Sequence, residues 1–279
     1  MQYLAPADLE GALTAVAEGN WTILAGGTDF YPVRVGRPLT EPVIDISGLD
    51  ELRGIIVTED SYRIGALTRW ADIRETDLPQ VFDGLRLAAA QIGGIQVQNA
   101  GTIAGNLCNA SPAADGIPPL LTLDASVELT SQAGRRLIPL QAFLTGYRRT
   151  DRRPDELVTA VIVPRGVDEE FSDFQKLGSR SYLVISIVMV ATVVESAGDG
   201  IIGEARIAVG ACSPVAQRLT RLESDLRGLK SSDRLEDLPT RDHLTGLAPI
   251  DDVRATASYR LDATLALVRR SLRRFSETK

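Results

Sequence analysis

The chain has 279 residues, 44% of them apolar and 24% charged, a composition typical of a globular protein with one large or two ordinary domains. Its formal net charge is −7, so no surplus of Lys and Arg is available to neutralise nucleic-acid phosphates. We therefore exclude a nucleic-acid partner. Small molecules or other proteins are the partners to expect.

Cysteine and histidine are scarce in this chain. Two cysteines, Cys108 and Cys212, are too few for a disulfide framework or an iron–sulfur cluster. We interpret Cys108 as a small buried hydrophobe. The one histidine, His243, lies in a polar stretch, so we expect no catalytic triad. Redox chemistry would need a bound organic cofactor, with no metal site and no catalytic side chain in this chain.

The N-terminal residues lack the basic and apolar regions of a signal peptide. The longest apolar stretch, residues 183–194, is too short to span a bilayer and predicts a buried strand. We expect a cytoplasmic protein without a transmembrane segment.

Apolar periodicity and turn residues predict mixed helices and strands in the first part of the chain. The expected elements are a helix over 7–18, strands at 21–25 and 43–46, a hairpin over 53–66, a helix that begins at Arg69 with Thr68 as its N-cap, and a helix over 81–92. After them, residues 93–106 are uncharged and rich in glycine and amide side chains. We interpret them as irregular backbone that a ligand could satisfy.

Farther along, the pattern predicts strands at 126–130 and 157–163, separated by an exposed charged connection at 148–156. From residue 171 it predicts a separate α+β unit, an antiparallel sheet backed by helices. Its expected elements are strands at 171–177, 185–194 and 205–211, a turn at 198–200, and helices at 219–228 and 251–275. The arginines of the last helix are expected on a solvated face, with a contact to a partner subunit as the alternative: Arg260, Arg269, Arg270, Arg273 and Arg274.

Two glycine-containing segments, residues 23–30 and 101–106, stand out because each offers a turn whose N–H groups suit phosphate oxygens. Neither is a Rossmann fingerprint or a P-loop. Each alone is also explained by a strand-to-helix turn that needs glycine. Together they favour a clamp on one dinucleotide.

The order of several motifs resembles one family along nearly the whole chain. The matching stretches are AGGTD at 25–29, IGALT at 64–68, GTIAGN at 101–106, ASPAAD at 110–115, LVTAVIVP at 157–164 and FQKLGSR at 174–180. They are similar to the FAD-binding medium subunit of the molybdenum hydroxylases, the family of xanthine dehydrogenase and aerobic carbon monoxide dehydrogenase.

This resemblance implies a mixed α+β and α/β fold. It implies a two-part FAD-binding domain of the vanillyl-alcohol-oxidase-like type at residues 1–170, with its subdomains divided near residue 55. A C-terminal α+β domain of the carbon monoxide dehydrogenase flavoprotein type would follow at residues 171–279.

The resemblance also implies which residues bind FAD. Residues 23–30 would hold the pyrophosphate and 101–106 the pyrophosphate and ribityl chain, with Asp115 on a cofactor hydroxyl and Lys176 near the flavin ring. The full expected set is Ile23, Leu24, Ala25, Gly26, Gly27, Thr28, Asp29, Phe30, Ile92, Gly93, Gly101, Thr102, Ile103, Ala104, Gly105, Asn106, Ala114, Asp115, Val158 and Lys176. Ala104 replaces a glycine usual in the family, so a slightly adjusted backbone is expected there. Tyr182 is either a half-buried strand residue or an aromatic shield for the flavin.

In such complexes a large molybdopterin subunit hydroxylates the substrate and a small subunit carries two [2Fe–2S] clusters. The resemblance gives this chain the remaining role, electron transfer through FAD to an outside acceptor, in a heterotrimer or a dimer of heterotrimers. Two alternatives stay open: a self-contained FAD-dependent oxidase or dehydrogenase of the same fold group, and a scaffold that has lost FAD.

Overall fold

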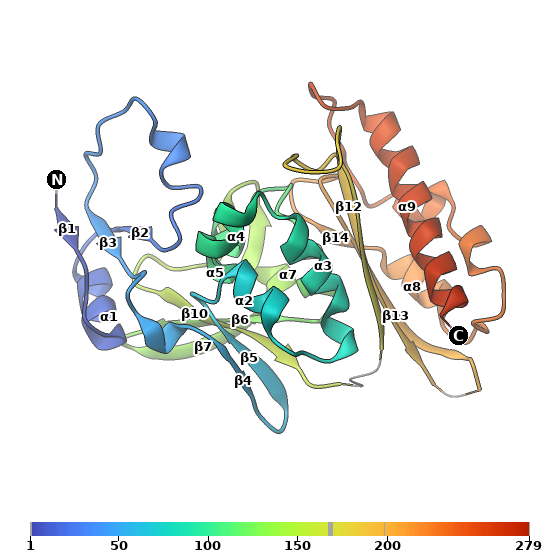
Figure 1. Cartoon of the computed structure of the whole chain (residues 1–279), viewed down its shortest axis with the longest axis horizontal. Helices are drawn as coiled ribbons and strands as arrows, with labels where there is room; N and C mark the ends of the chain where they lie inside the picture. The colour runs from blue at the N-terminus through green and yellow to red at the C-terminus, as the bar shows by residue number, and fades with distance from the viewer. Residues whose placement is uncertain (1, 167–169, 198, 279) are drawn as a thin grey trace.

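The computed structural model describes residues 2–166, 170–197 and 199–278. In this part of the chain, three sheets of three, five and four strands follow one another, together with a two-stranded pair. The N-terminal sheet lies at one end of the elongated molecule and the C-terminal sheet at the other (Figure 1). Short 3₁₀ helices at Pro32–Arg34, Asp50–Leu52, Gln80–Phe82, Leu235–Asp237 and Arg241–Leu244 lie in the connections.

The first sheet is parallel, in the order β1-β3-β2, and it packs against helix α1. The bounds are β1 (Tyr3–Leu4), α1 (Leu9–Glu18), β2 (Thr22–Leu24) and β3 (Val43–Asp45). Asp8 caps α1 by accepting a hydrogen bond from the N–H of Gly11 (2.8 Å). This confirms the helix expected at 7–18 and both early strands.

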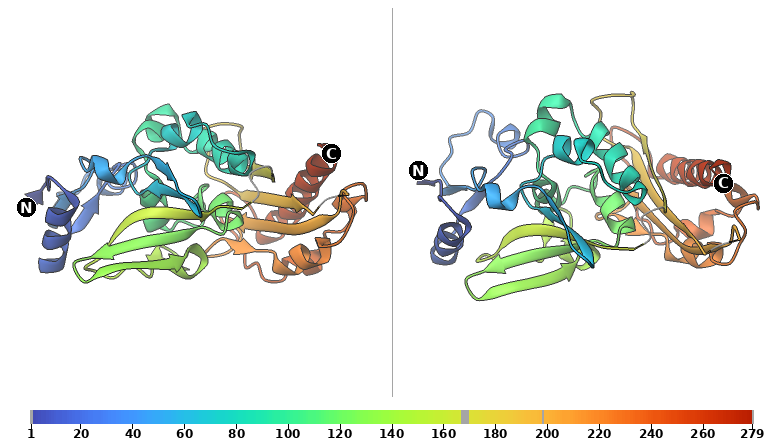
Figure 2. Two further views of the ribbon diagram at one scale, coloured as in Figure 1. Left: turned by 90° about the horizontal axis from the view of Figure 1, so that it is seen from below. Right: turned by 60° about the horizontal axis from the view of Figure 1, so that its bottom comes forward.

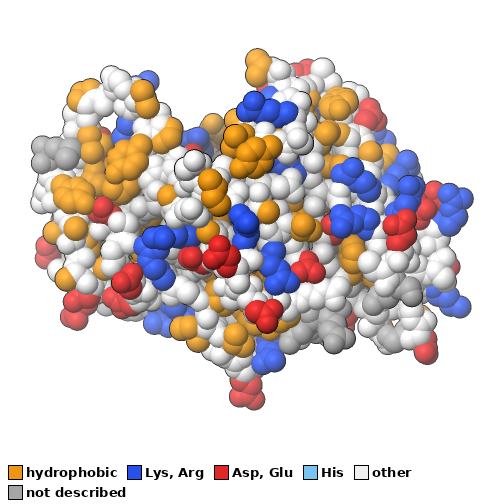
Figure 3. All heavy atoms as spheres, in the orientation of Figure 1, with side chains coloured by type: hydrophobic (Ala, Val, Ile, Leu, Met, Phe, Trp, Pro, Cys, Tyr) orange, Lys and Arg blue, Asp and Glu red, His pale blue; other side chains and the backbone are white. Residues whose placement is uncertain are grey.

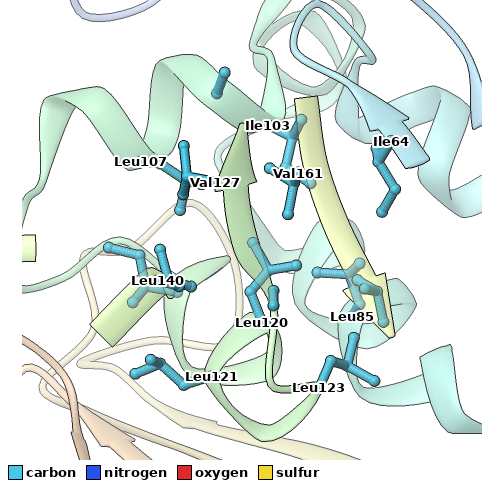
Figure 4. Close-up of a cluster of buried hydrophobic side chains, with 14 of the residues drawn as sticks. Ile64, Leu85, Ile103, Leu107, Leu120, Leu121, Leu123, Val127, Leu140 and Val161 are labelled. Carbon is cyan, nitrogen blue, oxygen red and sulfur yellow. The ribbon is translucent and has the colours of Figure 1, made fainter. Parts of the chain in front are cut away.

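The five-stranded antiparallel sheet has the order β4-β5-β10-β6-β7 and carries a layer of short helices on one face. Its strands are β4 (Ile55–Val57), β5 (Ser61–Gly65), β6 (Ser126–Ser131), β7 (Gly134–Pro139) and β10 (Leu157–Pro164), and β8 (Leu144–Gly146) pairs with β9 (Arg149–Thr150) beside it. The helices are α2 (Trp70–Glu75), α3 (Asp83–Gln91), α4 (Ile95–Ala100), α5 (Ile103–Asn109), α6 (Ile117–Thr122) and α7 (Leu140–Phe143). In the core, Ile103 and Leu107 of α5 point at Val127 and Val161 of the sheet (Figure 4).

The C-terminal sheet is antiparallel, in the order β11-β12-β13-β14, and is covered on both faces (Figure 2). Its elements are β11 (Phe171–Leu177), β12 (Val188–Ser196), β13 (Ile202–Gly210), β14 (Gln217–Arg218), α8 (Thr220–Leu226) and α9 (Ala257–Glu277). Helices α8 and α9 pack on one face, and α3 and α6 of the preceding unit pack on the other. Burial on both faces explains why β12 is a continuous apolar run rather than an alternating one.

Several expectations about local structure were wrong. Residues 93–106 are not irregular, because α4 and the start of α5 take up most of that segment. The hydroxyl of Thr68 donates to Gly54 O instead of capping α2, and the Asp72 carboxylate accepts from the N–H of Arg69 at the helix start. The strand expected from 185 begins at Val188, and the last helix begins at Ala257, not 251.

Four further outcomes concern residues after position 133. Strand β7 was not anticipated, and the stretch 148–156 contains β9 and the buried Glu156, so it is not wholly exposed. Part of the turn expected at 198–200, Gly198, lies outside the described residues. Among the arginines of α9, Arg260 is buried and pairs with Asp252 (2.7 Å), while the others lie on the exposed face as expected.

Candidate cofactor site

A cavity of about 630 Å³ opens beside the N-terminal sheet. Its walls come from the loop after β2, the exposed side of α5 and the β8–β9 hairpin. Figure 3 shows the corresponding hollow in the surface, next to the projecting N-terminal part of the molecule. The lining mixes apolar and polar groups, as ligand sites commonly do.

The loop after β2 presents a row of unused donors to this cavity. Residues 26–30 all line it, and none of their backbone N–H groups has an acceptor among the described residues. Gly27 has φ +73°, a left-handed conformation that glycine adopts without strain. Because buried or partly buried N–H groups normally find a partner, this row is suited to the oxygens of an anion.

Gly26 lies where two segments of the chain come into close contact. A Cβ at Gly26 would lie 2.0 Å from Ala100 O and 3.1 Å from Gly101 Cα. The loop after β2 therefore packs directly on the backbone that leads into α5. Glycine at position 26 allows this contact between two chain segments.

Residues 101–106 form the beginning of α5 rather than a free loop, and most of their N–H groups are already used. Ile103 N–H donates to Thr68 O (2.9 Å) and Ala104 N–H to Ala66 O (3.2 Å). Thr102 is the N-cap and accepts from Gly105 N–H (3.1 Å). This helix start therefore offers few backbone donors to a pyrophosphate. Ala104 is helical and is not among the residues with positive φ, so no adjustment of the backbone is needed there.

The exposed side of α5 is nevertheless open to a ligand. A Cβ at Gly105 would meet only Thr102 Oγ1 (2.8 Å) within 4 Å. The neighbouring Asn106 Oδ1 is buried and has no hydrogen-bond partner among the described residues. An unpartnered polar atom of this kind is rare in native proteins, and it fits a site that a ligand with hydroxyl groups completes.

The structure brings together most of the expected site residues in this cavity. Those that line it are Ile23, Ala25, Gly26, Gly27, Thr28, Asp29, Phe30, Ile92, Gly101, Thr102, Ala104, Gly105, Asn106 and Val158. Those that do not are Leu24, Gly93, Ile103, Ala114, Asp115 and Lys176. Leu24 and Ile103 have buried side chains that belong to the core.

Asp115 and Lys176 form an ion pair with each other. Lys176 Nζ lies 2.6 Å from Asp115 Oδ2 and donates to Gln91 O (3.1 Å), and Ser186 Oγ donates to Asp115 Oδ1 (2.5 Å). Burial raises the pKa of the Asp115 carboxyl, and Lys176 opposes that rise. The pair ties β11 to the segment before α6. A smaller cavity of about 50 Å³ beside Lys176 is lined by the exposed Tyr182, which lies on a bend and not in a strand.

Sequence reasoning missed another part of the wall. Arg148, Thr150 and Arg152 of the β8–β9 hairpin line the cavity, although their stretch was expected to be an exposed connection. Cys108 also lines it and is exposed, so its interpretation as a buried hydrophobe was wrong. The surrounding walls raise the pKa of the Cys108 thiol to about 11, partly offset by Arg152. No sequence motif marks these positions.

His243 has a structural role in the C-terminal unit. Its Nδ1 accepts from the N–H of Thr240 (2.9 Å), and its Nε2 lies 3.0 Å from Asp225 Oδ2. Among the described residues, no group of three or more His, Cys, Asp or Glu side chains is placed to hold a metal ion. None of the described helices combines the length and apolar character needed to cross a bilayer.

Comparison with protein families defines the class to which this chain belongs. A family model described as the FAD binding domain in molybdopterin dehydrogenase matches residues 1–166. A second, the CO dehydrogenase flavoprotein C-terminal domain, matches residues 174–275. The chain therefore belongs to the family of FAD-binding medium subunits of molybdenum hydroxylases.

Curated relatives agree with this family. The chain is 30% identical over 264 residues to the xanthine dehydrogenase FAD-binding subunit of Escherichia coli O157:H7, covering 93% of this chain and 90% of that protein. It is 37% identical over 196 residues to the nicotinate dehydrogenase FAD-subunit of Eubacterium barkeri, covering 67% of this chain and 66% of that protein. A carbon monoxide dehydrogenase structure from Hydrogenophaga pseudoflava matches 98% of this chain and 96% of the solved chain at 27% identity, with a TM-score of 0.87.

Proposed function

We propose that this chain binds FAD in the cavity between the loop after β2, α5 and the β8–β9 hairpin. The observation that carries the proposal is the row of backbone N–H groups at residues 26–30, which line the cavity without an acceptor among the described residues. When bound there, FAD supplies the exchange of electrons between one- and two-electron partners. The chain's own residues position the cofactor and surround its charge.

We propose further that the subunit accepts electrons from [2Fe–2S] clusters of a small partner subunit and passes them to an external acceptor. A large molybdopterin subunit would complete the complex, as a heterotrimer or a dimer of heterotrimers in the cytoplasm. The family membership supports this role. The molybdenum and iron–sulfur centres would belong to the partner subunits.

Our assignment of the fold within this proposal has two parts. We propose a FAD-binding domain of the vanillyl-alcohol-oxidase-like type at residues 1–170, divided near residue 55, and a second domain at 171–279. The break between the parallel N-terminal sheet and the antiparallel five-stranded sheet supports the division near 55. The cavity lies between these two sheets, which agrees with a two-part cofactor domain.

The first test is to purify the complex through a tag on this chain and record its visible spectrum and metal content. Flavin bands together with co-purifying molybdenum and iron subunits support the proposal. Flavin without partners would favour a self-contained flavoenzyme. A colourless protein that binds no added FAD would overturn the assignment of the cavity.

Cys108 allows a test of where FAD binds. It is exposed in the cavity, while Cys212, the other cysteine, is fully buried, so a thiol reagent should modify only Cys108 in the folded apoprotein. Labelling at alkaline pH compensates for the raised pKa of this thiol. FAD is expected to protect Cys108, measured by mass spectrometry. Equal labelling of Cys108 with and without saturating FAD would place the cofactor elsewhere.

A further inference from the structure

The ionisable groups around the cavity are arranged to receive a negatively charged ligand. Among the described residues, Asp29 is the acidic side chain in the lining, and the basic ones are Arg34, Arg148 and Arg152. None of these arginines was anticipated as a site residue. The groups that each arginine is paired with determine how much uncompensated positive charge it presents to a ligand.

Arg34 is largely neutralised by the protein itself. Its guanidinium makes two hydrogen bonds to Glu41 Oε1, at 2.6 and 2.8 Å, and lies over the ring of Phe30. A paired guanidinium of this kind offers little net charge to a ligand. Arg34 therefore stabilises the loop after β2 rather than balancing an anion in the cavity.

Arg152 is fixed in place but keeps its charge. Its Nη1 donates to Glu156 O (2.7 Å) and Arg153 O (3.0 Å), and no carboxylate pairs with it among the described residues. Carbonyl partners orient the guanidinium without cancelling its charge. Its charge also lowers the pKa of the Cys108 thiol, against the larger opposite effect of the surrounding cavity walls. Arg152 and Cys108 both line the cavity.

Arg148 is anchored only through its backbone. Its N–H donates to Ala110 O (3.0 Å) just after α5, and its φ of +51° is a left-handed conformation uncommon for a residue with a side chain. Its guanidinium has no ion-pair partner among the described residues, and it lies 5.9 Å from the ring centroid of Tyr147. The fold therefore holds a charged, unpaired side chain at the cavity wall.

We propose that Arg148 and Arg152 are cofactor-binding residues that balance the charge of the FAD pyrophosphate. The inference rests on the proposed function. A pyrophosphate diester carries two negative charges, and such an anion is stable away from water only when opposite charges or donors surround it. The start of α5 has used most of its N–H groups, so residues 26–30 would supply dipoles on one side and the two arginines full charges on the other.

The experiment measures binding of FAD and of riboflavin, which has no phosphate, to the apoprotein by flavin fluorescence. The variants are Arg148→Gln and Arg152→Gln, with Arg149→Gln as the matched control, because Arg149 is exposed and does not line the cavity. We expect the Kd for FAD to rise about tenfold in each variant. The Kd for riboflavin should stay unchanged, as should both values in the control. Salt should weaken FAD binding less in the variants.

Three outcomes would overturn the assignment: an FAD Kd within twofold of the parent in both variants, an equal loss for riboflavin, or an equal loss in the control. Failure of the parent protein to bind FAD at all would instead overturn the proposed function. Because Arg152 also holds backbone carbonyls, Arg152→Lys tests charge separately from packing. Lysine at position 152 should restore most FAD affinity, whereas continued loss in a folded protein would contradict the role of charge.

Discussion

Removal of either member of the Asp115–Lys176 pair should destabilise the protein strongly. Both side chains are buried, with exposed fractions of 9% for Asp115 and 5% for Lys176. In Lys176→Met the carboxylate would keep only the hydroxyl of Ser186 as a donor, and in Asp115→Asn the ammonium would keep Gln91 O and a neutral amide. Breaking a buried ion pair in this way costs about 3–5 kcal/mol.

The assay is urea unfolding of the apoprotein, with a double-mutant cycle. Trp21 and Trp70 both precede the pair in the chain, so their fluorescence reports on the N-terminal part and circular dichroism on the whole. Coincident transitions would justify a two-state free energy. The double variant Asp115→Asn/Lys176→Met should cost about 1–3 kcal/mol less than the sum of the single variants. Strictly additive costs would refute the view that this contact joins β11 to the preceding unit.

The contribution of the Asp115–Lys176 pair to stability also depends on pH. Burial raises the pKa of Asp115 and Lys176 opposes the rise, so without the lysine the pKa of the carboxyl should be higher still. A raised folded-state pKa means that the folded protein gains stability by taking up a proton as the pH falls. The cost of Lys176→Met should therefore shrink toward acid pH. FAD affinity is the second readout, because a direct cofactor contact would weaken FAD binding in Asp115→Asn beyond the effect on stability.

Two further predictions concern Glu156 and Gly27. Glu156→Gln removes a carboxylate that accepts from Arg136 Nε (2.6 Å) and Arg153 N–H (2.7 Å), with an expected loss of about 2–3 kcal/mol near neutral pH. Because Arg136 lowers the pKa of Glu156 below its ordinary 4.5, this loss should shrink as the pH falls below that value, and a constant urea-midpoint difference from pH 7 to acid would contradict it. Gly27→Leu should reduce the flavin-to-protein ratio after gel filtration, because a Cβ there lies 2.7 Å from Tyr31 Cε2 at φ +73°; full flavin occupancy would count against the role of the loop.

The sequence predicts helices and strands well where contacts between residues close in the sequence determine them. Helix α1 begins at its Asp8 cap, and the β4–β5 hairpin closes at its polar turn. The prediction from sequence fails at residues 93–106, because the composition of that segment favours irregular backbone. The start of α5 is stabilised by carbonyls of residues 66 and 68, which lie far away in the sequence. A hydrogen bond between distant segments leaves no periodic signal in either one.

The same distinction applies to the candidate site. Residues in glycine-rich motifs can be recognised one by one, and most of them do line the cavity. Arg148 and Arg152 could not be recognised, because they reach the cavity only when the β8–β9 hairpin packs beside α5, and a charged stretch is more often an exposed connection. Lys176 pairs with Asp115 and does not line this cavity, so its expected place beside the flavin stays a prediction.

Gly26 and Gly105, one from each motif, have different structural roles. Two variants can distinguish these roles. Gly26→Ala would place a methyl group 2.0 Å from Ala100 O, a backbone atom that cannot move aside easily, so it should lower the free energy of unfolding by about 1–3 kcal/mol even without cofactor. Gly105→Ala would place a methyl group 2.8 Å from the capping hydroxyl of Thr102, which must shift, but alanine favours the helix, so the loss of stability should be smaller than at Gly26. Its methyl group would instead occupy the open side of α5 and weaken FAD binding. Urea unfolding and FAD titration of both variants test this assignment, and the reverse pattern would show that Gly26 faces the ligand and Gly105 holds the fold.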